Sequence, residues 1–95
     1  MIKPTIGRVV LVSRNSRNSI SQWQPALICR VNADDTINVG GFDTSGTPFA
    51  EIDLELRQGD ITDDPVFIPQ DLIGQRFACW MPYQRQQSER KEKEG

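Results

Sequence analysis

The feature that most restricts the fold of this chain is the shortness and spacing of its apolar segments. Runs rich in Val, Ile and Phe recur along the sequence, and Gly, Pro, Asp or Asn separates each run from the next. Branched and aromatic side chains favour β-strands, and the separating residue types favour turns. The pattern predicts five strands, which we place at residues 6–13, 25–32, 35–43, 49–57 and 76–82.

Short connections join most of these strands, and one longer segment, 61–75, precedes the last of them. The chain has 95 residues, which is the length of one domain. We therefore predict a mainly β protein in residues 1–84: a small, five-stranded, strongly bent antiparallel barrel of the Src-homology-3 type. Residues 85–95 are mostly charged and are predicted to be a disordered tail. One helical turn is predicted at 69–75.

The strand predicted at 49–57 alternates between apolar and acidic residues after Phe49. Successive side chains of a strand point to opposite faces, so one set is expected to pack on the core and the other to face water. The packing set consists of Ala50, Ile52, Leu54 and Leu56, and the water-facing set of Glu51, Asp53 and Glu55.

Three of the predicted strands contain uninterrupted apolar runs, VVLV, ALIC and FACWM. Such runs are typical of strands buried on both faces. In so small a chain the second face is covered either by segment 61–75 or by a partner chain, and we predict a homo-oligomer. Cys29 and Cys79 lie inside two of the runs and are predicted to be buried, reduced thiols, with a bridge between adjacent strands left open.

Composition restricts the partners. The chain has 11 basic and 13 acidic side chains and a formal net charge of −2, so DNA and RNA are not the expected ligands. No apolar run approaches the length of about 18 residues that spans a bilayer, and the first residues lack a secretory pattern. We expect a cytoplasmic protein with no membrane partner.

Catalytic constellations are missing from the sequence. The chain has no histidine, which excludes Ser–His and Cys–His nucleophilic sites and histidine metal sites. The segment GGFDTSG lacks the spacing and the lysine of a phosphate-binding loop. The acidic groups at 34–43 and 60–64 lack the spacing of a calcium loop and are read as solvated turns. We predict no enzymatic activity, no metal and no cofactor.

Charge is segregated along the chain. Residues 1–33 hold five basic and no acidic side chains, and residues 34–64 hold nine acidic side chains and one basic side chain, Arg57. This distribution can steer an anionic ligand to one side of the molecule. Alternatively, it can reflect pairing between strands, for instance of Arg8 or Arg30 with the carboxylates of 51–55.

The repeat SRNSRNS, in the connection between the first two predicted strands, supplies the candidate binding residues. Two guanidinium groups can grip a phosphate there, and a tryptophan at the end of the connection can offer a stacking face. Alternatively, the segment is only a flexible tether, and the tryptophans pack in the core. The candidate ligand- or partner-binding residues are Arg8, Arg14, Arg17, Trp23, Trp80 and Tyr83.

Five segments in a fixed order, PTIGRVV, QPAL, INVGGFDTSGTP, LRQGD and ACWMPYQ, resemble a family of small, uncharacterised proteins of tailed bacteriophages and prophages. The resemblance covers about residues 3–84. The chain departs from the family pattern at Leu11, where an aromatic residue is common, and in segment 61–75, which is longer here. The resemblance implies a phage source, an accessory role in the host cytoplasm and no catalytic residues.

These observations lead to one expected function and two alternatives. The expected function is that of a non-enzymatic phage accessory protein that binds and inhibits or sequesters a host defence or regulatory component. Its partner would be a host protein or an anionic, nucleotide-like ligand. The alternatives are a minor structural or assembly protein of the virion and a barrel that binds single-stranded nucleic acid.

Overall fold

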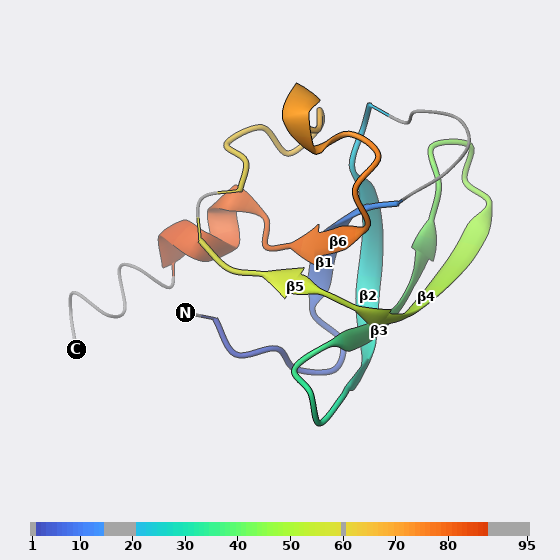
Figure 1. Cartoon of the computed structure of the whole chain (residues 1–95), viewed down its shortest axis with the longest axis vertical. Helices are drawn as coiled ribbons and strands as arrows, with labels where there is room; N and C mark the ends of the chain where they lie inside the picture. The colour runs from blue at the N-terminus through green and yellow to red at the C-terminus, as the bar shows by residue number, and fades with distance from the viewer. Residues whose placement is uncertain (1, 15–20, 60, 88–95) are drawn as a thin grey trace.

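The predicted β architecture is confirmed by a computed structural model, which describes residues 2–14, 21–59 and 61–87 (Figure 1). One curled sheet, a half-barrel, has the strand order β4-β3-β2-β1-β6-β5. Its strands are β1 (Val9–Ser13), β2 (Gln24–Val31), β3 (Ile37–Phe42), β4 (Pro48–Leu54), β5 (Leu56–Arg57) and β6 (Phe77–Cys79). The described residues thus contain six strands and not five, and β5 pairs with β6 in parallel.

The additional strand arises because the strand predicted at 49–57 divides at Glu55. β4 is one edge of the sheet and β5 is the other, and this single residue connects them. The backbone N–H of Ala78 donates to the carbonyl of Glu55 at 2.7 Å, which begins the parallel pairing. The chain therefore carries one sheet edge round to the other, and this link curls the sheet.

A bulge in β4 reverses the faces that the alternation predicted. Asp53 has a positive φ of 52°, and the register between β3 and β4 shifts at this point. Before the bulge, Glu51 is half-buried inside the curl and Ile52 is 64% exposed, which is the reverse of the prediction. Beyond the bulge the prediction holds, because Leu54 is fully buried. One inserted residue exchanges the two faces of a strand, and period-two reasoning assumes that no such residue is present.

The main core fills the inside of the curl. At its crossing with β2, β3 contains Gly41, where a Cβ atom would lie 2.1 Å from the carbonyl oxygen of Pro25, so no other residue fits at this close approach. Trp80 belongs to this core, and its Nε1 donates to Oε1 of Gln58 at 3.1 Å. The core residues are Ile2, Val10, Val12, Ala26, Ile28, Ile37, Val39, Leu54, Ala78 and Trp80.

A second core lies between the outside of the sheet and segment 61–75. Leu11, Trp23, Phe77 and Cys79 form it with Ile68 of this segment. The segment holds the short 3₁₀ helix η1 (Gln70–Leu72), within the helical turn predicted at 69–75. β6 and residues 10–13 of β1 are therefore buried on both faces without a partner chain, which is one of the two expected arrangements.

The outside of β2 is different, because segment 61–75 does not cover it. Leu27 is 49% exposed, and Cys29 is exposed rather than buried as predicted. Cys29 and Cys79 are both free thiols. Cys29 faces outward by the ordinary alternation of β2, on the same side as Leu27, and the bulge between Ile28 and Arg30 places Arg30 on that side as well.

Residues 82–87 are helical and follow β6 directly. The Gln84 side chain donates to the carbonyl of Val9, and Nη2 of Arg85 donates to the carbonyl of Thr62. The start of the predicted tail thus contacts the barrel, while residues 88–95 lie outside the described part of the chain. No helix in the described residues is long and apolar enough to cross a membrane.

Candidate anion-binding site at the barrel seam

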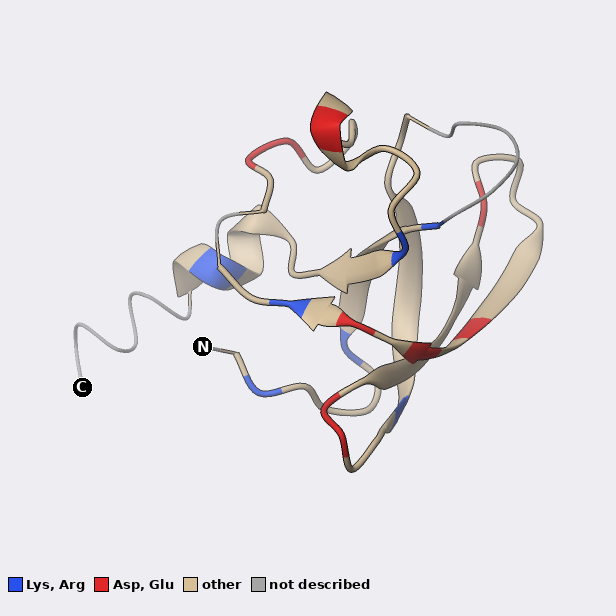
Figure 2. Cartoon of the chain, in the orientation of Figure 1, with Lys and Arg blue, Asp and Glu red and all other residues tan. Residues whose placement is uncertain are grey.

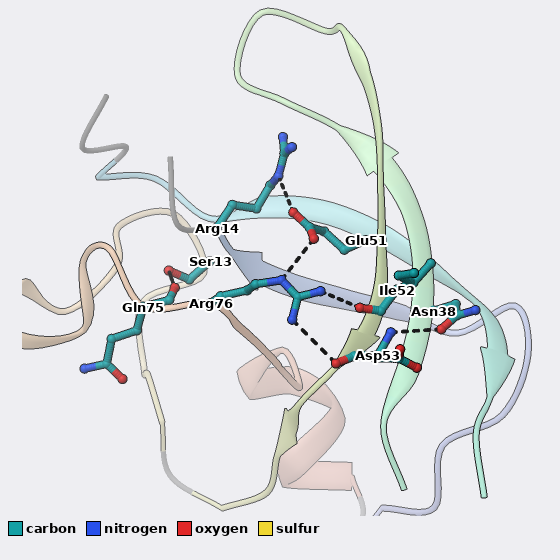
Figure 3. Close-up of polar contacts among 8 residues, drawn as sticks. All are labelled: Ser13, Arg14, Asn38, Glu51, Ile52, Asp53, Gln75 and Arg76. Atoms are coloured by element: carbon teal, nitrogen blue, oxygen red, sulfur yellow. Dashed lines mark hydrogen bonds and ion pairs between the residues drawn. The ribbon is translucent and has the colours of Figure 1, made fainter. Parts of the chain in front are cut away.

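The edge of β4 meets the ends of β1 and β6 at what we call the seam, formed by Arg14, Glu51 and Arg76 (Figure 3). Nε of Arg14 lies 3.0 Å from Oε1 of Glu51, and Nε of Arg76 lies 3.1 Å from Oε2. The carboxylate is only 19% exposed and shares its two oxygens between the two guanidinium groups. The three side chains together carry one net positive charge.

Arg76 closes the seam against the backbone of β4. Its Nη2 donates to the carbonyl of Ile52, and its Nη1 donates to the carbonyl of Asp53 (Figure 3). An unpaired strand edge normally exposes such carbonyls. Arg76 thus occupies part of this edge in place of a neighbouring strand.

Arg14 is fixed in position, but only part of its hydrogen-bonding capacity is used. Its guanidinium lies over the Phe49 ring, with 4.2 Å between Cζ and the ring centroid, and its Nε is bound to Glu51. Beside it, the hydroxyl of Ser13 donates to the carbonyl of Gln75 at 2.7 Å and anchors the end of β1. Nη1 and Nη2 of Arg14 have no acceptor among the described residues, and Figure 3 shows them directed away from Glu51. A paired N–H fork of this kind matches the oxygens of a phosphate or a carboxylate.

Charge pairing between strands is present, but the predicted arginines do not make it. Neither Arg8 nor Arg30 has an ion pair with the carboxylates of 51–55 in the described part of the chain; Arg14 and Arg76 do. Figure 2 shows acidic positions on β4 and a basic position directly before β6. Sequence segregation could not identify Arg76, because it lies outside the basic segment 1–33, whereas Arg14 lies inside that segment.

The other predicted site residues are dispersed. Trp23 packs edge-to-face on Phe77, with 5.7 Å between ring centroids, and Trp80 is buried in the main core. Neither indole face is open to a ligand, because both side chains are at least nine-tenths buried. The guanidinium of Arg8 lies 5.9 Å from the Trp80 ring centroid.

Tyr83 is exposed, and its hydroxyl accepts a hydrogen bond from Gln87. Arg17 lies outside the described residues. Of the six candidates, the structure therefore places only Arg14 at the seam. Its neighbours Phe49, Glu51 and Arg76 were not predicted, since only strand register brings them together.

The acidic turns serve local structure. Oδ1 of Asp43 accepts the backbone N–H groups of Ser45 and Thr47, both at 2.9 Å. Hydrogen bonds from the side chain and backbone of Thr36 lower the pKa of Asp34 below its ordinary value. Such Asx turns are a common way to end a strand.

Segment 61–75 also forms an open hollow of about 450 Å³, lined by Ile61, Thr62, Asp63, Asp64, Phe67, Ile68 and Pro69. Its carboxylates are already bonded. Asp63 pairs with Arg85, and Asp64 accepts the backbone N–H groups of Val66 and Phe67. These contacts hold segment 61–75 in place, so the carboxylates of the hollow already have partners within the protein.

The thiols differ in reactivity. Burial raises the pKa of Cys79 to about 12, although the positive charge of Arg57 opposes the shift. Cys79 therefore stays protonated at neutral pH. Within the described ranges, no three Cys, Asp or Glu side chains come close enough together to hold a metal ion.

Comparison of the chain with protein-family models, with curated proteins and with solved structures found no match. The seam must therefore be interpreted from its own geometry.

Proposed function

We propose that this chain is a non-enzymatic binding protein that takes a phosphate-bearing, nucleotide-like ligand at the seam. The observation that carries the proposal is the state of Arg14, whose guanidinium is fixed by Glu51 and Phe49 while its Nη fork has no acceptor in the described residues. The resemblance to phage proteins supports the biological role: sequestering an anionic signal of a host defence or regulatory system.

Preorganisation makes this arginine a better anion ligand than an ordinary surface arginine. A free arginine loses side-chain entropy when it binds, at a cost of about 0.5–1.5 kcal/mol for each long side chain that becomes immobilised. Arg14 is already immobilised, since it is stacked on an aromatic ring and hydrogen-bonded through Nε. The neighbouring Arg76 adds positive charge on the other side of Glu51.

The chemistry of the seam favours binding over catalysis. Both oxygens of Glu51 are bonded to guanidinium groups, so this carboxylate is poorly placed to accept a proton from a substrate. The buried Cys79 thiol has a raised pKa of about 12 and is therefore a poor nucleophile. The chain has no histidine to activate a hydroxyl or a thiol.

The burial of the tryptophans favours a small ligand over single-stranded nucleic acid. Binding of such strands relies on exposed aromatic platforms along a basic groove. Trp23 and Trp80 are in the cores, and the acidic β4 lies beside the seam.

Titration calorimetry with inorganic pyrophosphate and a panel of mono- and dinucleotides tests the proposal. Arg14→Lys keeps the charge but removes the fork, and loss of two charge-assisted hydrogen bonds, about 1.5 kcal/mol each, should weaken binding about a hundredfold. Arg30→Lys is the matched control, because Arg30 is exposed on β2 and away from the seam. Equal weakening by both changes, or no binding of any probe by the unmodified protein, would refute the proposal.

A further inference from the structure

The outside of the sheet carries an apolar surface that segment 61–75 leaves uncovered. Cross-strand pairing puts Val9, Leu27, Gly40 and Ala50 in one row across β1, β2, β3 and β4. Leu27 is 49% exposed, and Phe42 and Ile52, on the same side of β3 and β4, are 54% and 64% exposed. We call this surface the outer face. Exposed apolar residues gathered in this way mark an interaction surface.

A hollow lies in the middle of the outer face. It has a volume of about 120 Å³ and is lined by Val9, Pro25, Ala26, Leu27, Gly40, Gly41 and Phe42, none of which is charged. Gly40 opens it: a Cβ atom there would be 3.7 Å from Sγ of Cys29 and 4.0 Å from its next neighbour. An apolar cavity of about 150 Å³ holds a benzene molecule, so this hollow suits one aliphatic side chain.

Leu27 is such a side chain, and it stands directly beside the hollow because it is paired with Gly40. A two-fold axis parallel to the strands, passing between β2 and β3, places β2 of one copy over β3 of the other. Leu27 of each copy then lies over the Gly40 hollow of its partner. An isologous contact requires this kind of self-complementary surface.

The same two-fold axis also brings opposite charges together at the margin of the outer face. Arg30 is paired with Asn38 in the sheet, and Asn38 binds the backbone of Asp53 at 3.0 Å. Rotation about the axis brings Arg30 of one copy over Asn38, and near Asp53, of the other. Arg30 has no ion pair among the described residues, so a second copy offers it an opposite charge.

We propose that this chain forms a face-to-face homodimer through the outer face, with Leu27 of each copy in the Gly40 hollow of the other. The dimer covers the exposed apolar residues of β2, β3 and β4. It leaves the seam open, because the Arg14 fork lies beside the free edge of β4 (Figure 3).

Sedimentation equilibrium over a series of protein concentrations tests the proposal. The unmodified protein should reach twice the mass of one chain. Leu27→Glu puts a charge into the partner's hollow and Gly40→Val fills the hollow, so each should weaken dimerisation about tenfold or more. Val66→Glu is the matched control, since Val66 is 48% exposed and lies in segment 61–75, outside the outer face. It should dimerise like the parent.

Alkylation of Cys29 provides a second measurement that needs no variant. Cys29 is exposed beside Gly40, whereas Cys79 is buried and protonated. The rate of Cys29 alkylation should fall as the protein concentration rises through the dimerisation range. A monomer at all concentrations, an alkylation rate independent of concentration, or variants at Leu27 and Gly40 that dimerise like the parent would each overturn the proposal.

Discussion

Replacing Arg76 by alanine should open the seam and lower the stability of the whole barrel. The change removes two hydrogen bonds to the β4 carbonyls of Ile52 and Asp53 and one ion pair with Glu51. Glu51 keeps its contact with Arg14, so the change does not leave the carboxylate without a partner. The effect therefore comes mostly from the uncapped edge of β4.

The size of the effect follows from these contacts. Each lost hydrogen bond to the backbone costs about 1 kcal/mol. The ion pair adds only about 0.5 kcal/mol, because the Arg76 side chain is 37% exposed and solvent screens the charge interaction. The free energy of unfolding should fall by about 2–3 kcal/mol, which corresponds to a Tm lower by about 10–15 °C in a domain of this size.

Thermal unfolding followed by circular dichroism measures this change. Lys3→Ala is the control, because it removes an exposed basic side chain that has no ion pair in the described residues and should shift Tm by only about 1–2 °C. Arg76→Lys should fall between the two, since an ammonium group keeps the charge but cannot reach both carbonyls at once. An Arg76→Ala protein that melts within about 2 °C of the parent would show that the seam contributes nothing to stability.

Three further predictions concern β3 and the thiols. Gly41→Ala should prevent folding or cost more than about 3 kcal/mol, because its Cβ would lie 2.1 Å from the Pro25 carbonyl oxygen. In Gly40→Ala the Cβ would lie 3.7 Å from its nearest neighbour, an ordinary contact distance, so this variant should still fold in the same assay. At pH 8 iodoacetamide should modify one thiol per folded chain, Cys29, as counted by mass spectrometry, and a second only after unfolding. The raised pKa of Cys79 also predicts that stability falls as pH rises from about 9 towards 12, because only the unfolded chain releases the thiol proton in this range. In Cys79→Ala this part of the decline should vanish. A Cys79→Ala protein with the same pH profile as the parent would contradict the assignment.

Much of the fold is predictable from the sequence because strand formation depends on local pattern. The ranges 25–32 and 35–43 coincide, within two residues at each end, with the observed Gln24–Val31 and Ile37–Phe42. Turn chemistry is equally local, since Asp43 binds backbone N–H groups only a few residues away. The strong bend also follows, because a short chain with many strands must curl its sheet to bury a core.

The candidate site is only partly predictable. Arg14 stands out in the sequence as an arginine in a polar connection, and its residue type alone suggests an anion. Its partners Glu51 and Phe49 come from β4, 37 residues away in the case of Glu51. That contact exists only because Asp53 adopts a positive φ and exchanges the faces of β4. A single backbone conformation cannot be read from a pattern of apolar and acidic residues.

What covers each strand was decided by tertiary structure alone. The runs VVLV, ALIC and FACWM have the same appearance in the sequence, yet segment 61–75 packs on Leu11 and Phe77 and leaves Leu27 in the open. Apolar composition fixes how much surface a strand must bury, because the cost of exposing it to water depends on area and not on partner. Which part of the protein covers that apolar surface depends on the path of the chain between strands. It also depends on contacts such as that of Arg76 with Ile52, which join residues far apart in the sequence.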